Sequence, residues 1–267
     1  MYEFKCPEPV HMLVKLGGGA AEIVAEARDT ATVDVAPFDN SDAARDLAAN
    51  TRVDLRDGRL IVEVPDSSGW PLRFRSPRIR VAIHVPLDST LQLKVASADA
   101  TCRGRYASAA VGSASGDIYV EQVTGDASVN TASGDARFVD VGGQLKANAA
   151  SGDVTVQSVG GEVSAHSASG DLEIAQAGAG VRTTTASGDV RVGAARRGAI
   201  KINSASGDVS VGVVEGTGVW LDLTTMSGAT RSDLAMNDST GSNRQDLTLQ
   251  VRTASGDITV HRVTDSR

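Results

Sequence analysis

The residues best placed for chemistry are aspartates that recur at a fixed spacing, each at the end of a Ser-Gly-Asp triplet. If each repeat forms one coil of a stacked structure, these aspartates make a single row of carboxylates. Carboxylate oxygens are the ligands that Ca²⁺ prefers, so a row of this kind could bind cations. The row consists of Asp117, Asp135, Asp153, Asp171, Asp189 and Asp208.

Stacked carboxylates about 5 Å apart repel one another by roughly 1 kcal/mol even in a water-like dielectric. Three arrangements could offset this repulsion: hydrogen bonds from backbone N–H groups of the same turn, bound cations, or a partner on a polar recognition face for sugar or protein. Calcium-binding nonapeptide rolls use a Gly-Gly-x-Gly-x-Asp turn, whereas one glycine precedes each aspartate here. The pattern therefore favours backbone hydrogen bonds, and we expect no metal and no cofactor.

A second candidate is the arginine-rich stretch LRFRSPRIR at 72–80. If it forms a strand, its alternating arginines share one outward face. That face is either solvated or a contact for an anion or a partner protein. The arginines are Arg73, Arg75, Arg78 and Arg80.

The remaining reactive residue types form no catalytic pattern. The four histidines are scattered without zinc spacing, and no Ser/His/Asp order can be assigned. An enzyme built on a β-solenoid, such as a polysaccharide lyase or hydrolase, would need acids clustered with basic or aromatic residues along a groove. Aromatic residues make up only 3% of the chain, so we predict that the protein is not an enzyme.

The elements that must position these residues follow from the 18-residue repeat. Apolar residues alternate with polar ones at positions 5 and 7 of each unit, counted from the alanine before Ser-Gly-Asp, and again at positions 14 and 16. This alternation predicts two strands per coil with one face buried. Position 5 holds Ile118, Ala136, Val154, Leu172 and Val190, and position 7 holds Val120, Phe138, Val156, Ile174 and Val192. We predict an all-β fold, a flattened β-solenoid.

The ends of a solenoid must be covered, because an open strand edge invites pairing with another chain. We therefore interpret residues 1–95 as a β-rich N-terminal cap that is continuous with the solenoid. One short helix is expected at 41–49, capped by Asn40 or Ser41. Residues 96–263 form the predicted repeat region, with an exposed loop at 237–244 and a disordered tail at 264–267.

The formal net charge is −7, which argues against binding to nucleic acid and against adhesion to anionic lipid by charge. Cys6 and Cys102 lie far apart without metal spacing, so we expect free thiols. The chain begins without a secretory signal pattern, and no stretch approaches about 18 apolar residues. These features predict a cytoplasmic protein that does not bind membranes.

Three segments together resemble a known bacterial family: the Ser-Gly-Asp-Val-x-Val ladder, residues 78–97 (RIRVAIHVPLDSTLQLKVAS) and residues 247–263 (LTLQVRTASGDITVHRV). It is the β-strand-repeat family labelled "putative adhesin", a domain of unknown function. The resemblance covers nearly the whole chain, including the helix-bearing stretch at 41–65. It implies an all-β fold and carries no catalytic residues to transfer.

The sequence thus predicts a non-catalytic binding or scaffold protein that presents repeated strand and turn surfaces to a protein or polysaccharide partner. Weak contacts repeated along the coils would add up. Two alternatives stay open, a cytoplasmic scaffold that assembles into a homo-oligomer and a β-roll stabilised by cations.

Overall fold

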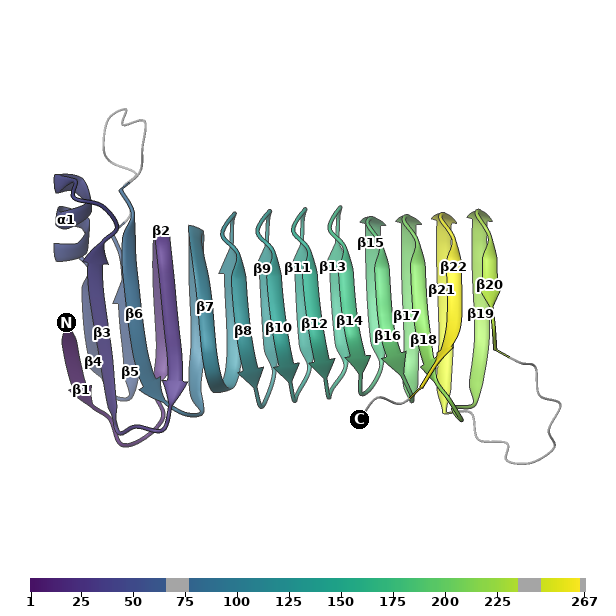
Figure 1. Cartoon of the computed structure of the whole chain (residues 1–267), viewed down its shortest axis with the longest axis horizontal. Helices are drawn as coiled ribbons and strands as arrows, with labels where there is room; N and C mark the ends of the chain where they lie inside the picture. Colours follow the sequence, from purple (N-terminus) through teal and green to yellow (C-terminus); the bar gives the residue numbers. More distant parts are fainter. Residues whose placement is uncertain (66–76, 235–245, 265–267) are drawn as a thin grey trace. The chain divides into compact units, whose positions relative to one another are not determined.

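The computed structural model describes residues 1–65, 77–234 and 246–264. The chain divides into two compact units, Met1–Arg137 and Phe138–Arg267. Strands dominate both units (Figure 1), so the predicted all-β solenoid is confirmed.

The first unit contains nine strands and one helix among its described residues, and a tenth strand, β10, spans the boundary. They are β1 (Tyr2–Lys5), β2 (His11–Glu26), β3 (Thr30–Pro37), α1 (Asp42–Ala49), β4 (Arg52–Arg56), β5 (Arg59–Glu63), β6 (Ile79–Pro86), β7 (Ser89–Ser113), β8 (Ile118–Val123), β9 (Ala127–Thr131) and β10 (Ala136–Val141).

The described part of the second unit continues with pairs of short strands. They are β11 (Leu145–Ala149), β12 (Val154–Val159), β13 (Val163–Ser167), β14 (Leu172–Ala177), β15 (Val181–Ser187), β16 (Val190–Ala195), β17 (Gly198–Ser206), β18 (Val209–Val214), β19 (Val219–Ser227), β20 (Thr230–Ser232), β21 (Leu247–Ser255) and β22 (Ile258–Val263).

Each regular coil of the second unit has two strands, and each strand pairs in parallel with the same strand of the next coil. Val154 lies beside Leu172, and Leu172 beside Val190. The other strand keeps the same step, because Val163 lies beside Val181. An 18-residue coil therefore brings like positions into register, as the repeat predicts.

The columns predicted to face inward form the core. Every residue at positions 5 and 7 of the five regular repeats is buried, including Phe138 at 1% exposure. Positions 14 and 16 are buried as well, from Ala127 and Val129 to Val181 and Thr183. Small aliphatic side chains fill a thin interior between two strand layers, which explains why the chain needs few aromatic residues.

The first unit begins with longer strands than the sequence pattern predicts. The strand β2 runs without interruption over residues 11–26 and pairs in parallel with β7 over most of its length. The chain bends at Gly19, where φ is +121° and a Cβ atom would overlap the carbonyl oxygen of Ile79. Glycine permits this bend and close approach without interrupting the strand.

Antiparallel strands and the helix lie against the outer coil of the first unit. β3 pairs antiparallel with β6, β4 with β5, and β1 with β3. The helix α1 contacts β3 and β6. Ser41 is its N-cap, and its hydroxyl accepts a hydrogen bond from the N–H of Ala44 at 3.2 Å, as predicted. The boundary expected at residue 95 falls inside β7.

The last coils of the second unit are not stacked in chain order. β21 lies between β17 and β19, and β22 lies between β18 and β20. Figure 1 shows the yellow β21 and β22 between green neighbours. The final Ser-Gly-Asp coil is thus inserted, and the degenerate coil of β19 and β20 is the terminal one. The loop expected at 237–244 lies outside the described residues, as does the tail beyond Thr264.

Candidate binding surfaces

The aspartate row exists within each unit, and its carboxylates bond to the backbone of the following coil. Each Oδ1 accepts a hydrogen bond from the N–H of the next aspartate, at 2.8–3.1 Å. The acceptors are Asp99 and Asp117 in the first unit, and Asp153, Asp171, Asp189 and Asp208 in the second. Asp257 accepts in the same way from the N–H of Ala229.

This arrangement corrects one detail of the sequence interpretation. We expected each carboxylate to accept from its own turn, but these bonds link one coil to the next. In this parallel stack the N–H of each aspartate points toward the preceding coil. The aspartate carboxylate of that coil is therefore its hydrogen-bond acceptor. A charge-assisted hydrogen bond is roughly twice as strong as a neutral one and offsets the repulsion between neighbouring carboxylates.

No group of three or more His, Cys, Asp or Glu side chains is placed to hold a metal within the described ranges. One oxygen of each row carboxylate from Asp153 to Asp208 is already committed to a backbone N–H. The cation-stabilised β-roll therefore stays a prediction with no site geometry behind it.

The arginine stretch is described only in part, since Arg73 and Arg75 lie outside the described residues. Arg78 and Arg80 are exposed, and both guanidinium groups lie over the ring of Phe38, at 4.4 and 5.5 Å from its centroid. Cation–π contacts of this kind stabilise an exposed surface modestly. The two arginines thus stack on β3's end, and their role in partner contact stays a prediction.

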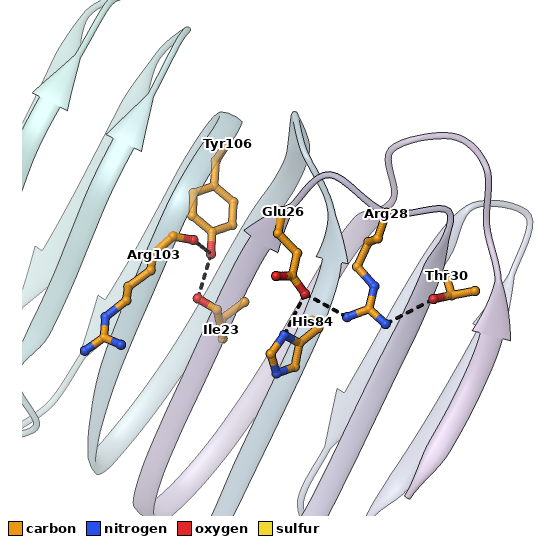
Figure 2. A network of polar contacts seen from close by, with 7 residues as sticks. All are labelled: Ile23, Glu26, Arg28, Thr30, His84, Arg103 and Tyr106. Carbon is orange, nitrogen blue, oxygen red and sulfur yellow. Dashed lines mark hydrogen bonds and ion pairs between the residues drawn. The ribbon is translucent and has the colours of Figure 1, made fainter.

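A polar network links β2 to its neighbours in the first unit (Figure 2). Glu26 accepts from Arg28 at 3.1 Å and lies 3.0 Å from Nδ1 of His84, while Arg28 also donates to Thr30 at 3.0 Å. Nearby, the buried hydroxyl of Tyr106 donates to the carbonyl oxygens of Ile23 and Arg103. Burial raises the pKa of Tyr106 far above its ordinary value, so this hydroxyl is a structural donor.

Both thiols are free and buried, in agreement with the sequence. Complete burial raises the pKa of Cys102 to about 12. Burial also raises the pKa of Cys6, and the positive charge of Arg28 offsets part of that rise. Since the thiolate is the reactive form, neither cysteine is activated as a nucleophile.

The sequence interpretation missed a basic face in the second unit. Lys146, Arg182 and Lys201 occupy one outward row on β11, β15 and β17, because Lys146 and Arg182 both lie beside Ser164 and Arg182 lies beside Lys201. Arg252 on β21 lies beside Asn203, two residues further along the strands. We call these four residues the basic face.

The cations of the basic face are exposed, and most have no counter-ion. Lys146, Arg182 and Lys201 form no ion pair with any other described residue, while Arg252 lies 3.7 Å from Asp222. The signal was present in the sequence, since Lys146 and Arg182 share repeat position 15, but the alignment of Lys201 with them depends on the pairing between coils.

A model of the family described as Toastrack DUF4097 matches residues 19–264. The chain belongs to the Toastrack DUF4097 family. No curated protein sequence matches it. Within the described residues, no helix has the length and hydrophobicity of a membrane span.

Solved structures share the fold of this Toastrack chain at low sequence identity. A "putative lipid binding protein" from Parabacteroides distasonis is 14% identical, with a TM-score of 0.53 over 98% of this chain and 95% of that one. A "putative adhesin" from Bacteroides fragilis is 12% identical, with a TM-score of 0.50 over the same shares. At these identities the likeness shows the fold alone.

Proposed function

We propose that this Toastrack chain is a non-catalytic binding protein whose basic face binds a polyanionic partner, a protein or a polysaccharide. The observation that carries the proposal is the row of three exposed cations on β11, β15 and β17, with Ser164 of β13 between the first two, for which the described residues provide no counter-ion. A linear anionic polymer crossing the strands would meet one cation after another at multiples of the strand spacing. Contacts that are weak singly then add up.

The chemistry of the rest of the chain supports binding over catalysis. The described thiols are buried and neutral, and one oxygen of each carboxylate from Asp153 to Asp208 accepts a backbone hydrogen bond. With only 3% aromatic residues, the chain has few rings on which sugars could stack, so charge would supply most of the recognition.

The overall charge limits what this face would bind. Nucleic-acid-binding proteins commonly neutralise about six to ten phosphates, whereas the basic face offers four cations on a chain of net charge −7. We therefore keep the prediction that nucleic acid is not the partner.

The adhesin and lipid-binding names of the two solved structures fit a binding role but name no ligand for this chain. A cytoplasmic location also stays a proposal, to be tested by cell fractionation.

Binding to polygalacturonate and to poly-glutamate, measured by calorimetry at low ionic strength, tests the proposal. The first probe is an acidic polysaccharide and the second an acidic polypeptide, so comparing them distinguishes a polysaccharide partner from a protein partner. We expect the double variant Arg182→Glu/Lys201→Glu to weaken binding about tenfold or more. Added salt should weaken binding of the wild type in the same direction.

The matched control is Arg137→Glu/Arg191→Glu, which changes the net charge equally on outward positions of the other strand of the coil. It should bind within about twofold of the wild type. If neither polymer binds, or if both double variants lose binding equally, the basic face is not a binding site.

A further inference from the structure

In the part of the second unit that the structure describes, the strand β19 of the terminal coil has one edge with which no strand pairs. Among the described residues, β19 pairs with β21 on one side and with no strand on the other. Its nine residues thus present a row of unpaired backbone N–H and C=O groups, a template on which another strand can add. Neither proline nor lysine, the usual blocking residues, occurs in β19.

Apolar side chains are exposed along the same edge. Trp220 and Met226 are 48% and 85% exposed, and they are the exposed large hydrophobic residues in the described part of the second unit. The inward residues Leu221 and Leu223 are half-buried, whereas their neighbours on β21 are fully buried. The core is therefore open on this side.

We propose that β19 pairs antiparallel with β19 of a second copy of the chain, about a twofold axis at Leu223. This register places Trp220 opposite Met226 of the second copy, and the symmetry repeats the pair. An aromatic ring and a thioether attract each other, so the two exposed residues would cover one another. On the inner side, Leu223 faces its own copy and Leu221 faces Thr225.

Charge selects this register over its neighbour. An axis at Asp222 would place that carboxylate directly opposite its copy, which is unfavourable for like charges in a strand pair. With the axis at Leu223, Asp222 faces the hydroxyl of Thr224 instead. Asp222 also keeps its hydrogen bond from Gln250 at 3.0 Å. An isologous contact closes on itself, so it gives a dimer and not a filament.

Sedimentation velocity over protein concentrations of roughly 1 to 200 µM tests the dimer. Because the interface is one strand pair with a few apolar contacts, we expect a dissociation constant on the order of 10 µM. Leu223→Lys and Leu223→Glu each place like charges across the axis. Each variant alone should be monomeric throughout this range.

An equimolar mixture of the two variants is the decisive arm. Lysine opposite glutamate across the axis should restore a dimer, which a misfolded variant could not do. Circular dichroism and cooperative thermal unfolding check that each variant is folded, and neither check involves the basic face, so this result is separable from the proposed binding function. A monomeric wild type at the highest concentration, dimers that persist in both single variants, or no dimer in the mixture would each overturn the proposal.

Discussion

The outer coil of the first unit and the terminal coil of the second both have strands with apolar inward faces, but among the described residues only the first is covered by further strands and a helix. In the first unit Ile83 lies between Ile23 on a parallel neighbour and Val33 on an antiparallel one, and it is fully buried. In the second unit Leu223 is half-buried, and Val251 is the one described residue that pairs with it. The antiparallel strands and the helix are thus what turns a repeat into a closed end.

The side chains of the terminal coil also reflect its exposure to water. Thr230 and Ser232 on β20 occupy the columns that hold Ile258 and Val260 in the neighbouring coil. Hydroxyls at these inward positions suit a strand that meets water on one side. On β19, by contrast, Leu221 and Leu223 keep the aliphatic pattern. This contrast is why we place the self-association site on β19.

The largest expected effect comes from truncating the covered core. Ile83→Ala should lower the free energy of unfolding by about 3 kcal/mol, because it leaves a cavity between two paired strands. Leu223→Ala should cost only about 1 kcal/mol, since its side chain is partly in water. Urea unfolding at low protein concentration measures both. Equal losses would show that β19 is covered in solution.

Gly104 and Gly216 have similar backbone conformations but differ in how closely a neighbouring strand approaches them. Gly104 and Gly216 have φ of +85° and +78°, but a Cβ would overlap the carbonyl oxygen of Ala25 at Gly104 and meets open space at Gly216. Gly216→Ala should cost about 1 kcal/mol for its conformation alone. Gly104→Ala should lower the stability clearly more, because the new methyl group also meets the Ala25 carbonyl oxygen. Thermal unfolding of the two variants measures the difference. Similar losses would mean that the strands are not packed this closely.

Loss of an aspartate hydrogen bond should lower the stability of the fold in an interior coil, but should loosen only the neighbouring strand at the terminal coil. Asp171→Ala removes an acceptor from the N–H of Asp189 and should cost about 1–2 kcal/mol, whereas Asp171→Asn keeps an acceptor oxygen and should cost less. Asp257→Ala frees the N–H of Ala229, so hydrogen exchange should rise within residues 227–232 more than elsewhere.

Addition of millimolar Ca²⁺ should leave the melting temperature unchanged. A clear rise would support the cation alternative.

The smallest effect is expected from the exposed ion pair between Asp88 and Arg105, whose shortest N–O distance is 2.7 Å. The hydrogen bond from Arg105 lowers the pKa of the Asp88 carboxyl. A lowered pKa contributes stability above the ordinary value near 3.9 and loses it as the pH falls through the folded value. The stability difference between wild type and Arg105→Ala should therefore be small near neutral pH and vanish in acid. A difference that does not shrink as the pH falls below the ordinary value of about 3.9 would contradict this assignment.

The sequence predicted the coils because their determinants are local and repeated. Alternation at positions 5 and 7 and a turn after each strand determine the two-strand coil, and Ser41 identifies the helix start. The inserted position of β21 could not be predicted, because every Ser-Gly-Asp coil offers the same parallel edge and nothing local selects its neighbour. The same holds for β1, a short strand whose pairing with β3 depends on tertiary contact. The basic face needed the register between coils before its cations could be placed together.

Disulfide trapping tests the stacking order most directly. Because Arg252 lies beside both Asn203 and Thr224, cysteines placed at 203 and 252, or at 224 and 252, should form a disulfide on mild oxidation. A pair at 203 and 224 should not, since β21 separates those strands, and the buried native thiols provide the background in the wild type. Efficient trapping of 203 with 224, without trapping of 203 with 252, would show that the coils follow chain order and would contradict the account.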